Sequence, residues 1–240
     1  MGLIVIFPKE KPVKGTGELV YLIEDDQAVR EELLDFLSSI EIEAIGFGSA
    51  VEFLAHVRSD DCSCLIVEMD MEEITGLELQ RRLDPQTHPP IIFVSEGINV
   101  ESTVAAMKAG AIEFLIRPIN TTVLRTAIEA ALMQDRILRR RRARRAQLQE
   151  RLSSLTPRQR EVLPLVIGGL LNKQAAALLH ISEVTLQIHR SQIMQKMAAD
   201  SFAELVRMAV ELRIPHWKGP SDRQSRARLP TRLPLEAEAP

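Results

Sequence analysis

Short apolar runs alternate with segments of helical periodicity between residues 18 and 132, and this alternation restricts the fold more than any other feature of the chain. The apolar runs occupy residues 18–24, 42–47, 63–68, 91–95 and 111–116. Continuous apolar runs of this length are typical of strands that are buried on both faces of a parallel sheet. The sequence therefore predicts an α/β doubly wound, flavodoxin-like domain with five parallel strands joined by helices.

Three of the expected helices carry an apolar stripe that should face this sheet. The stripes consist of Val29, Leu33, Phe36 and Leu37, then of Val51, Leu54 and Val57, and in the last helix of Leu124, Ile128, Ala131 and Leu132. Ser49 precedes the second stripe and suits an N-cap, because its hydroxyl can accept a hydrogen bond from a free backbone amide.

Two of the predicted strands end in acidic residues. Glu24, Asp25 and Asp26 follow the first strand, and Glu68 ends the third. Ligands of open α/β sheets bind beyond the carboxyl ends of the strands. These carboxylates are therefore expected to share one pocket that attracts cations.

The charges divide the chain into an acidic part and a basic part. Residues 18–134 contain 22 acidic and 7 basic side chains, and residues 135–240 contain 10 acidic and 20 basic ones, although the whole chain has a net charge of only −3. This division suggests a metal or phosphoryl site in the first part and a polyanionic partner for the second. Ordinary solvated surfaces would explain either part alone but not so sharp a change of sign.

The change of sign coincides with a change in the expected secondary structure. Residues 133–152 form a basic linker that includes the arginine-rich run 139–145, and good helix formers allow it to continue the preceding helix. Only helical signals occur from residue 153 to residue 214. Residues 1–17 are expected to be a flexible leader, and residues 215–240 a disordered tail rich in proline, arginine and serine.

The cysteines and the apolar content indicate the compartment. The only two cysteines are Cys62 and Cys64, and their spacing suits neither a zinc site nor a redox motif. No apolar segment is long enough for a signal-peptide core or a membrane span. We therefore expect a cytoplasmic protein with reduced thiols and no membrane partner.

The basic part contains the pattern of a short helix, a tight turn and a longer helix. Before it, Thr156 and Pro157 suit the N-cap and first position of another helix. Ser182 and Glu183 suit the start of the longer helix, because serine caps free amides and glutamate favours the positive end of the helix dipole. Helical spacing directs Leu186, Ile193 and Met197 inward and Gln187, Ile188, Ser191 and Gln192 outward.

Residues 18–132 resemble the receiver domain of bacterial response regulators, particularly of the FixJ-like group. The matching pieces are Glu24-Asp25-Asp26 with Val29-Arg30, the run from Thr75 to Leu79, Ser95, the run from Ala106 to Ala111, and Arg117-Pro118. The resemblance implies that Glu24 and Asp25 are the acid pair that binds magnesium. It also implies that Ser95 contacts a phosphoryl group and that Phe114 is the aromatic residue that moves on activation.

Three positions depart from the receiver pattern. Glu68 replaces the phosphoacceptor aspartate, Arg117 replaces the lysine that pairs with it, and Glu72 replaces a proline. A glutamate carboxyl reaches one methylene further, which disturbs the geometry of phosphoryl transfer. Two glutamates in place of aspartates also disfavour the cofactor magnesium at Glu24, Asp25 and Glu68. Arg117, by contrast, offers a planar fork that could hold Glu68 through two hydrogen bonds.

Three interpretations of Glu68 are open. It can imitate the phosphorylated state and hold the domain active, which is the interpretation that we favour. It can instead be a remnant in a domain whose regulation has been lost or transferred to a ligand or partner. Phosphorylation at Glu68 or the nearby Asp70 is the third interpretation, and it is disfavoured because receivers contribute only a backbone carbonyl at the position of Asp70. The sequence thus predicts a pseudo-receiver.

Residues 153–214 resemble the DNA-binding domain of the LuxR/FixJ family. Asn172-Lys173 through Thr185, His189 and Lys196-Met197 carry this resemblance. It implies that residues 183–197 form a recognition helix that enters the major groove. The residues expected to contact DNA are Lys173, Thr185, Gln187, Ile188, Arg190, Ser191 and Lys196.

Two positions of this domain differ from the common family sequence. Gln187 replaces a lysine, which weakens phosphate attraction but allows a bidentate pair with adenine. His180 stands where glycine is frequent, and histidine tolerates the left-handed backbone conformation better than most residues do.

The sequence therefore predicts a transcriptional regulator of the two-component type, not an enzyme, that binds double-stranded DNA as a homodimer and acts independently of phosphorylation. Two alternatives are open. The protein could be an adaptor or antagonist that binds a sensor kinase or another regulator, or a regulator that still responds to phosphoryl donors. The last helix, which contains Leu205 and Leu212, could cover the core or form a dimer seam.

Overall fold

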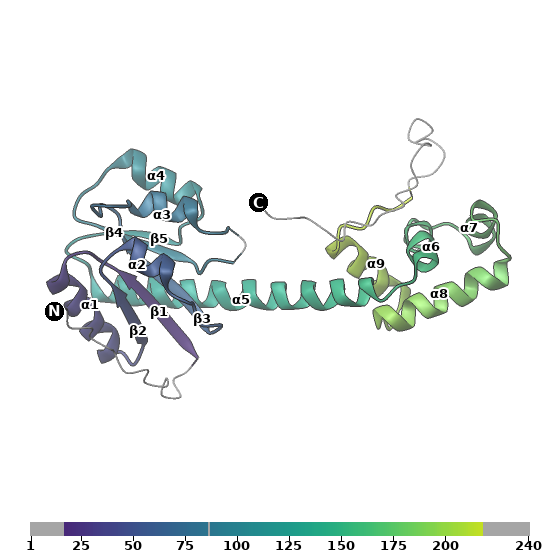
Figure 1. Ribbon diagram of the computed structural model, residues 1–240, viewed down its shortest axis with the longest axis horizontal. Helices are drawn as coiled ribbons and strands as arrows, with labels where there is room; N and C mark the ends of the chain where they lie inside the picture. Colours follow the sequence, from purple (N-terminus) through teal and green to yellow (C-terminus); the bar gives the residue numbers. More distant parts are fainter. Residues whose placement is uncertain (1–16, 86, 218–240) are drawn as a thin grey trace, which may run out of the picture. The chain divides into compact units, whose positions relative to one another are not determined.

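The computed structural model describes residues 17–85 and 87–217 (Figure 1). The chain divides into two compact units, Met1–Arg139 and Arg140–Pro240, and each has its own apolar core. Most of the predicted leader, residues 1–16, and most of the predicted tail, residues 218–240, lie outside the described residues.

The first unit is built on a five-stranded parallel sheet with the strand order β2-β1-β3-β4-β5. The strands are β1 (Glu18–Ile23), β2 (Glu43–Phe47), β3 (Cys62–Glu68), β4 (Ile91–Ser95) and β5 (Glu113–Ile116). The helices are α1 (Gln27–Ser39), α2 (Ala50–Ala55), α3 (Gly76–Arg82), α4 (Val100–Lys108) and α5 (Thr121–Ser153). The predicted doubly wound, flavodoxin-like fold is confirmed.

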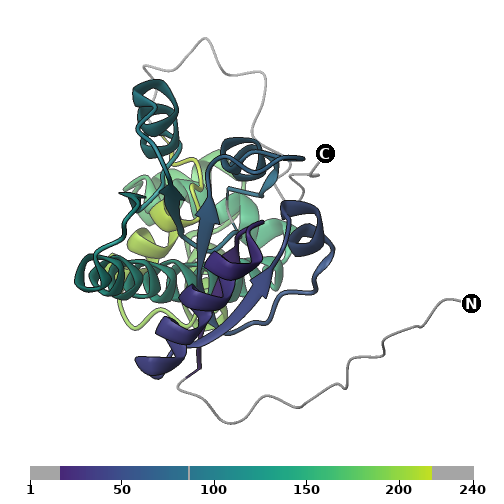
Figure 2. The same ribbon diagram turned by 90° about the vertical axis from the view of Figure 1, so that its left-hand side faces the viewer.

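The sheet carries one apolar cluster on each face, because successive residues of a strand point to opposite sides. Tyr21 and Ile23 belong to the cluster shared with α2, α3 and α4, whereas Leu22 belongs to the cluster shared with α1 and α5. Figure 2 shows helices on both sides of the sheet. The stripes predicted for the first and last helices are confirmed, since Leu37 and Ile128 are fully buried.

The stripe predicted for the second helix is wrong. Its three members are exposed over large parts of their surface: Val51 by 49%, Leu54 by 41% and Val57 by 90%. Phe53 is buried instead, with its ring centroid 5.6 Å from that of Tyr21 and 5.5 Å from that of Phe47. Burial of this larger aromatic surface decides which side of the short helix faces the sheet. The predicted cap at Ser49 is confirmed.

A buried carboxylate of helix α5 forms a hydrogen bond with the sheet. Asp135 is completely buried and accepts hydrogen bonds from the backbone amide of Ser63 at 2.9 Å and from Nε of Arg139 at 2.5 Å. Arg139 also donates to the backbone carbonyl of Asp60 at 2.8 Å. One helix thus covers both the end of the predicted receiver-like domain and the predicted linker.

The second unit is all-α. It contains the end of α5 together with α6 (Pro157–Ile167), α7 (Asn172–Leu178), α8 (Glu183–Met197) and α9 (Phe202–Glu211). Leu186, Ile193 and Met197 of α8 are buried in its core, as predicted. Leu205 and Met208 show that α9 covers this core. Helices α7 and α8 with the turn between them form a helix-turn-helix.

Local signals at the ends of these helices are confirmed. Thr156 and Gln159 exchange hydrogen bonds in a capping box, with Pro157 as the first helical residue. Ser182 accepts a hydrogen bond from the Thr185 amide at 3.0 Å. His180 has a φ of 52°, in the left-handed region expected for it.

In the part of the chain that the structure describes, no helix has the length and apolar content needed to cross a membrane.

Candidate functional site

The carboxyl edge of the sheet brings Glu24 and Glu68 together. The register pairs Ile23 with Val67, so the residues that follow them lie at neighbouring strand ends. Both glutamates are buried, with 3% of Glu24 and 6% of Glu68 exposed. Two buried carboxylates require compensation by a positive group or a proton.

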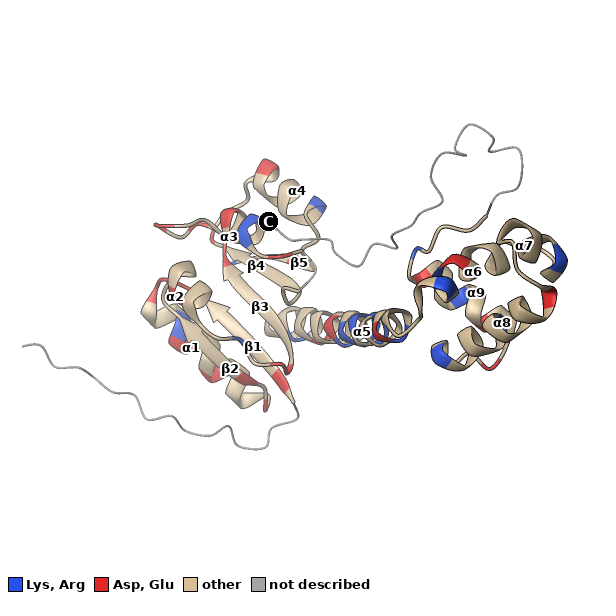
Figure 3. Cartoon of the chain, turned by 45° about the vertical axis from the view of Figure 1, so that its right-hand side comes forward, with Lys and Arg blue, Asp and Glu red and all other residues tan. Residues whose placement is uncertain are grey.

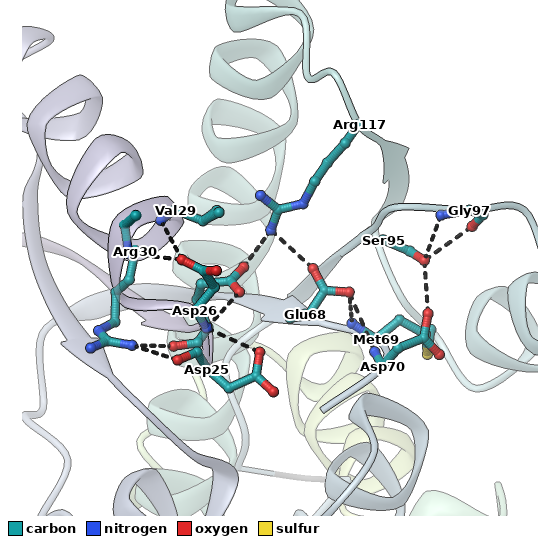
Figure 4. Close-up of polar contacts among 12 residues, drawn as sticks. Asp25, Asp26, Val29, Arg30, Glu68, Met69, Asp70, Ser95, Gly97 and Arg117 are labelled. Carbon is teal, nitrogen blue, oxygen red and sulfur yellow. Dashed lines mark hydrogen bonds and ion pairs between the residues drawn. The ribbon is translucent and has the colours of Figure 1, made fainter. Parts of the chain in front are cut away.

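Arg117 supplies that positive group from the end of β5. Its Nη2 atom donates to Oε2 of Glu68 at 3.0 Å and also forms a short ion pair with Oε2 of Glu24 (Figure 4). The bidentate contact with Glu68 that the sequence suggested is not formed, because a single hydrogen bond joins Arg117 to Glu68. Glu24 competes for the same guanidinium because β1 delivers its carboxylate to the same edge. We call these three residues the Glu24–Arg117–Glu68 triad.

Burial and charge act against each other within the triad. Burial raises the pKa of Glu24, although Arg117 partly opposes this shift. Burial alone would lower the pKa of Arg117, but the carboxylates of Glu68 and Glu24 outweigh it and the pKa of Arg117 is raised. Arg117 therefore stays protonated, and the triad is held by charge-assisted hydrogen bonds.

Glu68 uses both of its carboxylate oxygens within the fold. Oε2 faces Arg117, while Oε1 accepts hydrogen bonds from the backbone amides of Met69 at 3.0 Å and Asp70 at 3.3 Å. These three hydrogen bonds fill most of the roughly four acceptor positions of a carboxylate, and the position that is left lies on Oε2, beside the guanidinium of Arg117. The arrangement suits an electrostatic clamp better than a nucleophile.

The predicted magnesium ligands do not form a cation site. Arg117 occupies the space between Glu24 and Glu68, and Asp25 is exposed. Asp26 caps α1 by accepting from the amides of Ala28 and Val29. Among the described residues, no group of three or more histidine, cysteine, aspartate or glutamate side chains is arranged to hold a metal ion. The residues present do not fit magnesium, because a cationic guanidinium takes its place between the carboxylates.

The other predicted receiver residues lie beside the triad without joining it. Ser95 is buried, and its Oγ lies 3.1 Å from Oδ2 of Asp70 and 3.0 Å from the carbonyl of Gly97. Phe114 packs toward Phe93, with ring centroids 6.5 Å apart. The contact between Ser95 and Asp70 is not anticipated from the sequence. It depends on β3 and β4 being neighbours, which only the strand order reveals.

Some of the predicted DNA-contacting residues are exposed, and others form hydrogen bonds within the unit. Lys173, Gln187, Ile188 and Ser191 are exposed, and the last three lie on one face of α8. Thr185 is half-buried beside the cap residue Ser182, with their hydroxyl oxygens 2.8 Å apart.

Two predicted DNA contacts are used inside the unit. Nη1 of Arg190 donates to Asn172 at 3.3 Å, and the guanidinium lies 4.6 Å from the ring centroid of Phe202. Lys196 donates to the backbone carbonyl of Ser154 at 2.9 Å and to Oε1 of Gln159 in α6 at 3.1 Å. The sequence carries no signal for these partners, because they come from other helices.

Comparison with known proteins matches each unit to a family. Residues 20–129 match the response regulator receiver domain, and residues 153–209 match the luxR family of bacterial regulatory proteins. Nodulation protein W of Bradyrhizobium diazoefficiens is 39% identical over 203 residues, which are 83% of this chain and 88% of that protein. The response regulator protein TodT of Pseudomonas putida is 39% identical over 87% of this chain and 95% of its own length.

Two further relatives extend this similarity. The transcriptional regulatory protein FixJ of Bradyrhizobium diazoefficiens is 34% identical over 80% of this chain and 94% of its own length. The low-resolution structure of the response regulator StyR superposes with a TM-score of 0.70, at 41% identity, over 81% of this chain and 98% of StyR.

Proposed function

This chain belongs to the FixJ-like response regulators, and we propose that the Glu24–Arg117–Glu68 triad sets its activity. In this proposal, phosphorylation at position 68 does not set the activity. The chain has the receiver domain and the LuxR-type DNA-binding domain of that family. The chain is a transcriptional regulator. Its LuxR-type domain implies DNA binding, and its receiver domain implies interaction with a kinase. Action in the cytoplasm as a homodimer is part of the proposal.

The shared guanidinium is the observation that carries this proposal. Nη2 of Arg117 lies between Glu24 and Glu68, in the pocket where the resemblance places magnesium and the phosphoacceptor. Its single positive charge offsets one of the two carboxylate charges, and so compensates the pair in part without a metal ion. Both oxygens of Glu68 are also hydrogen-bonded, so its carboxylate is held by the chain's own residues. The receiver is a pseudo-receiver in this proposal.

The DNA-binding part of the proposal assigns different tasks to the predicted contacts. Gln187, Ile188 and Ser191 form the exposed face that would read base edges in the major groove. Lys173 and Thr185 would contact phosphates. The hydrogen bonds of Arg190 and Lys196 to neighbouring helices support a positioning role for these two residues.

Intact mass measurement after incubation with magnesium and acetyl phosphate tests the triad. We expect no gain of a phosphoryl group by the full-length protein, because the carboxylate of Glu68 is engaged by Arg117 and two backbone amides and because Arg117 lies where magnesium would bind. The matched control restores the family residues in the combined variant Glu24→Asp, Glu68→Asp, Arg117→Lys. A phosphoryl group on the control alone would support the proposal, whereas a stable phosphoryl group on the wild type would refute it.

A salt-dependent mobility shift with promoter fragments tests the DNA-binding part against the adaptor alternative. We expect specific complexes at moderate salt and their loss in a variant that removes the exposed face of α8. Absence of any specific complex for the wild type would favour an adaptor or antagonist that binds a kinase or another regulator.

A further inference from the structure

The end of α5 is an integral part of the DNA-binding unit. Leu148 and Leu152 are buried in the same core as the helix-turn-helix, with 2% and 5% of their surfaces exposed. Nη1 of Arg151 donates to the carbonyl of Met197, the last residue of α8, at 3.1 Å. Residues 140–153 are therefore held in place by the fold of this unit and are more than a linker.

One face of this helical segment consists of arginines. Arg140, Arg141, Arg144 and Arg145 are all exposed, and helical geometry places the four within a single arc of the helix. We call them the arginine face. Nε of Arg144 pairs with Glu211 of α9 at 3.0 Å, which fixes the orientation of the face on the unit. Figure 3 shows basic residues gathered on α5.

Arg144 is the only member of the arginine face with a salt bridge among the described residues, so most of the positive charge of this face is not balanced within the unit. No acidic residue occurs between Arg136 and Gln149 in the sequence. Among the described residues, no carboxylate forms a salt bridge with Arg140, Arg141 or Arg145. Like charges four residues apart destabilise a helix. An external polyanion would relieve this repulsion.

We infer that the arginine face is a second DNA-contacting surface, which binds the sugar-phosphate backbone. Arginine suits this task because its planar fork binds phosphate through two hydrogen bonds. Such contacts add affinity and fix position without reading bases. This inference rests on the proposed DNA-binding function.

The composition of the segment favours DNA over an anionic membrane. Helices that lie on membranes combine a basic face with a large apolar one. Here, the residues between the arginines and the buried Leu148 are small or polar: Ala143, Ala146 and Gln147 are exposed and offer no anchor for lipid. The shared fold with the helix-turn-helix places the arginines on the unit that already has DNA as its partner.

The salt dependence of binding to a 40-base-pair duplex of mixed sequence tests the inference, because the arginine face should not depend on a target site. In the full-length variant Arg140→Gln, Arg141→Gln, Arg145→Gln, the slope of log Kobs against log salt should become less steep by about 2 to 3, since each lost phosphate contact changes it by roughly 0.9. Affinity at low salt should fall at least tenfold. Circular dichroism should show unchanged helix content.

The matched control removes the same number of charges from exposed arginines of the receiver domain, in the variant Arg58→Gln, Arg81→Gln, Arg125→Gln. Its salt slope should equal that of the wild type. Equal slopes for wild type and both variants would overturn the inference alone, while the proposed function would stand. Failure of the wild type to bind any duplex would overturn both.

Two further measurements separate DNA from other partners. Vesicles with phosphatidylserine should not sediment the wild type, and sedimentation that the arginine substitutions abolish would overturn the choice of DNA. Analytical ultracentrifugation without DNA should give the same oligomeric state for wild type and variant. A shift in that state would assign the arginine face to contact between two copies of the chain and would equally overturn the inference.

Discussion

Arg117 and Glu24 form an ion pair although they are 93 residues apart and the strands that carry them, β5 and β1, are separated by β3 and β4. The pair exists because the long arginine side chain reaches back along the carboxyl edge of the sheet. Glu68 lies between them in the strand order and shares the same Nη2 atom. The site resembles a receiver pocket in which a side chain has taken the central position.

Removal of Arg117 should destabilise the receiver domain. Arg117→Ala leaves two buried carboxylates without their cation, which typically costs about 3 kcal/mol. Calorimetry of the full-length protein at pH 7 measures the change in the receiver transition. Arg125→Ala is the matched control, because its partner Glu129 is exposed, and it should change stability by less than about 0.5 kcal/mol. Equal effects of the two substitutions would contradict the importance of the triad.

Glu24 should give the receiver domain a characteristic pH dependence. Burial raises the pKa of Glu24 above its ordinary value of 4.5, so folding disfavours its ionised form. The contribution of Glu24 to the free energy of unfolding is therefore greatest at low pH. It is lost as the pH rises from the ordinary pKa of the unfolded state through the raised pKa of the folded state.

Glu24→Gln removes this ionisation and should show its largest relative gain in stability at pH 7. The gain should shrink as the pH falls toward about 4.3, where an unfolded glutamate also takes up its proton. Urea denaturation at several pH values measures it. A gain that grows toward low pH would instead indicate a lowered pKa.

Glu68→Ala should weaken dimerisation and DNA binding together if the triad holds the active arrangement. The substitution removes the carboxylate that bridges Arg117 and the amides of Met69 and Asp70. Sedimentation and fluorescence anisotropy measure the two equilibria separately, and we expect both to fall by about tenfold, which corresponds to roughly 1.4 kcal/mol. Unchanged DNA affinity would mean that the receiver does not gate the output.

Ala198→Gly should stabilise the DNA-binding unit. Ala198 caps α8 with a φ of 50° and an exposed side chain, a conformation that costs alanine more than glycine. Relief of the left-handed conformation, which costs alanine about 1–2 kcal/mol, should exceed the entropic cost of glycine, about 0.5–1 kcal/mol, so we expect a net gain in thermal unfolding. Ala146→Gly is the opposite control, because exposed Ala146 lies inside α5 and glycine there should cost about 1 kcal/mol. Stabilisation by both substitutions would contradict this account.

Gln187→Ala should relax sequence specificity. Gln187 is exposed on the face of α8 that would enter the major groove, and loss of a good base contact costs about 1–3 kcal/mol. Competition between duplexes selected by the wild type and single-base variants measures the discrimination. Gln195→Ala, also exposed but near the end of the helix, should leave the base preference unchanged. Loss of discrimination in both variants would argue against direct readout by Gln187.

Local and periodic signals predicted much of the fold. The apolar runs predicted all five strands, and the caps at Ser49, Thr156 and Ser182 lie where the sequence placed them. These features depend on interactions within a few residues, so a single sequence contains them. The second helix was predicted with the wrong buried face, because periodicity does not reveal that Phe53 meets Tyr21 and Phe47.

The sequence by itself determined that this protein has a receiver followed by a helix-turn-helix domain, and that Glu68 and Arg117 depart from the receiver pattern. Only the tertiary structure decided that Arg117 binds Glu24 as well as Glu68, and that Arg190 and Lys196 are held by other helices. The physical reason is the same in each case. A side chain's partner depends on which distant elements the fold brings within hydrogen-bonding distance, and local sequence patterns do not contain that distance.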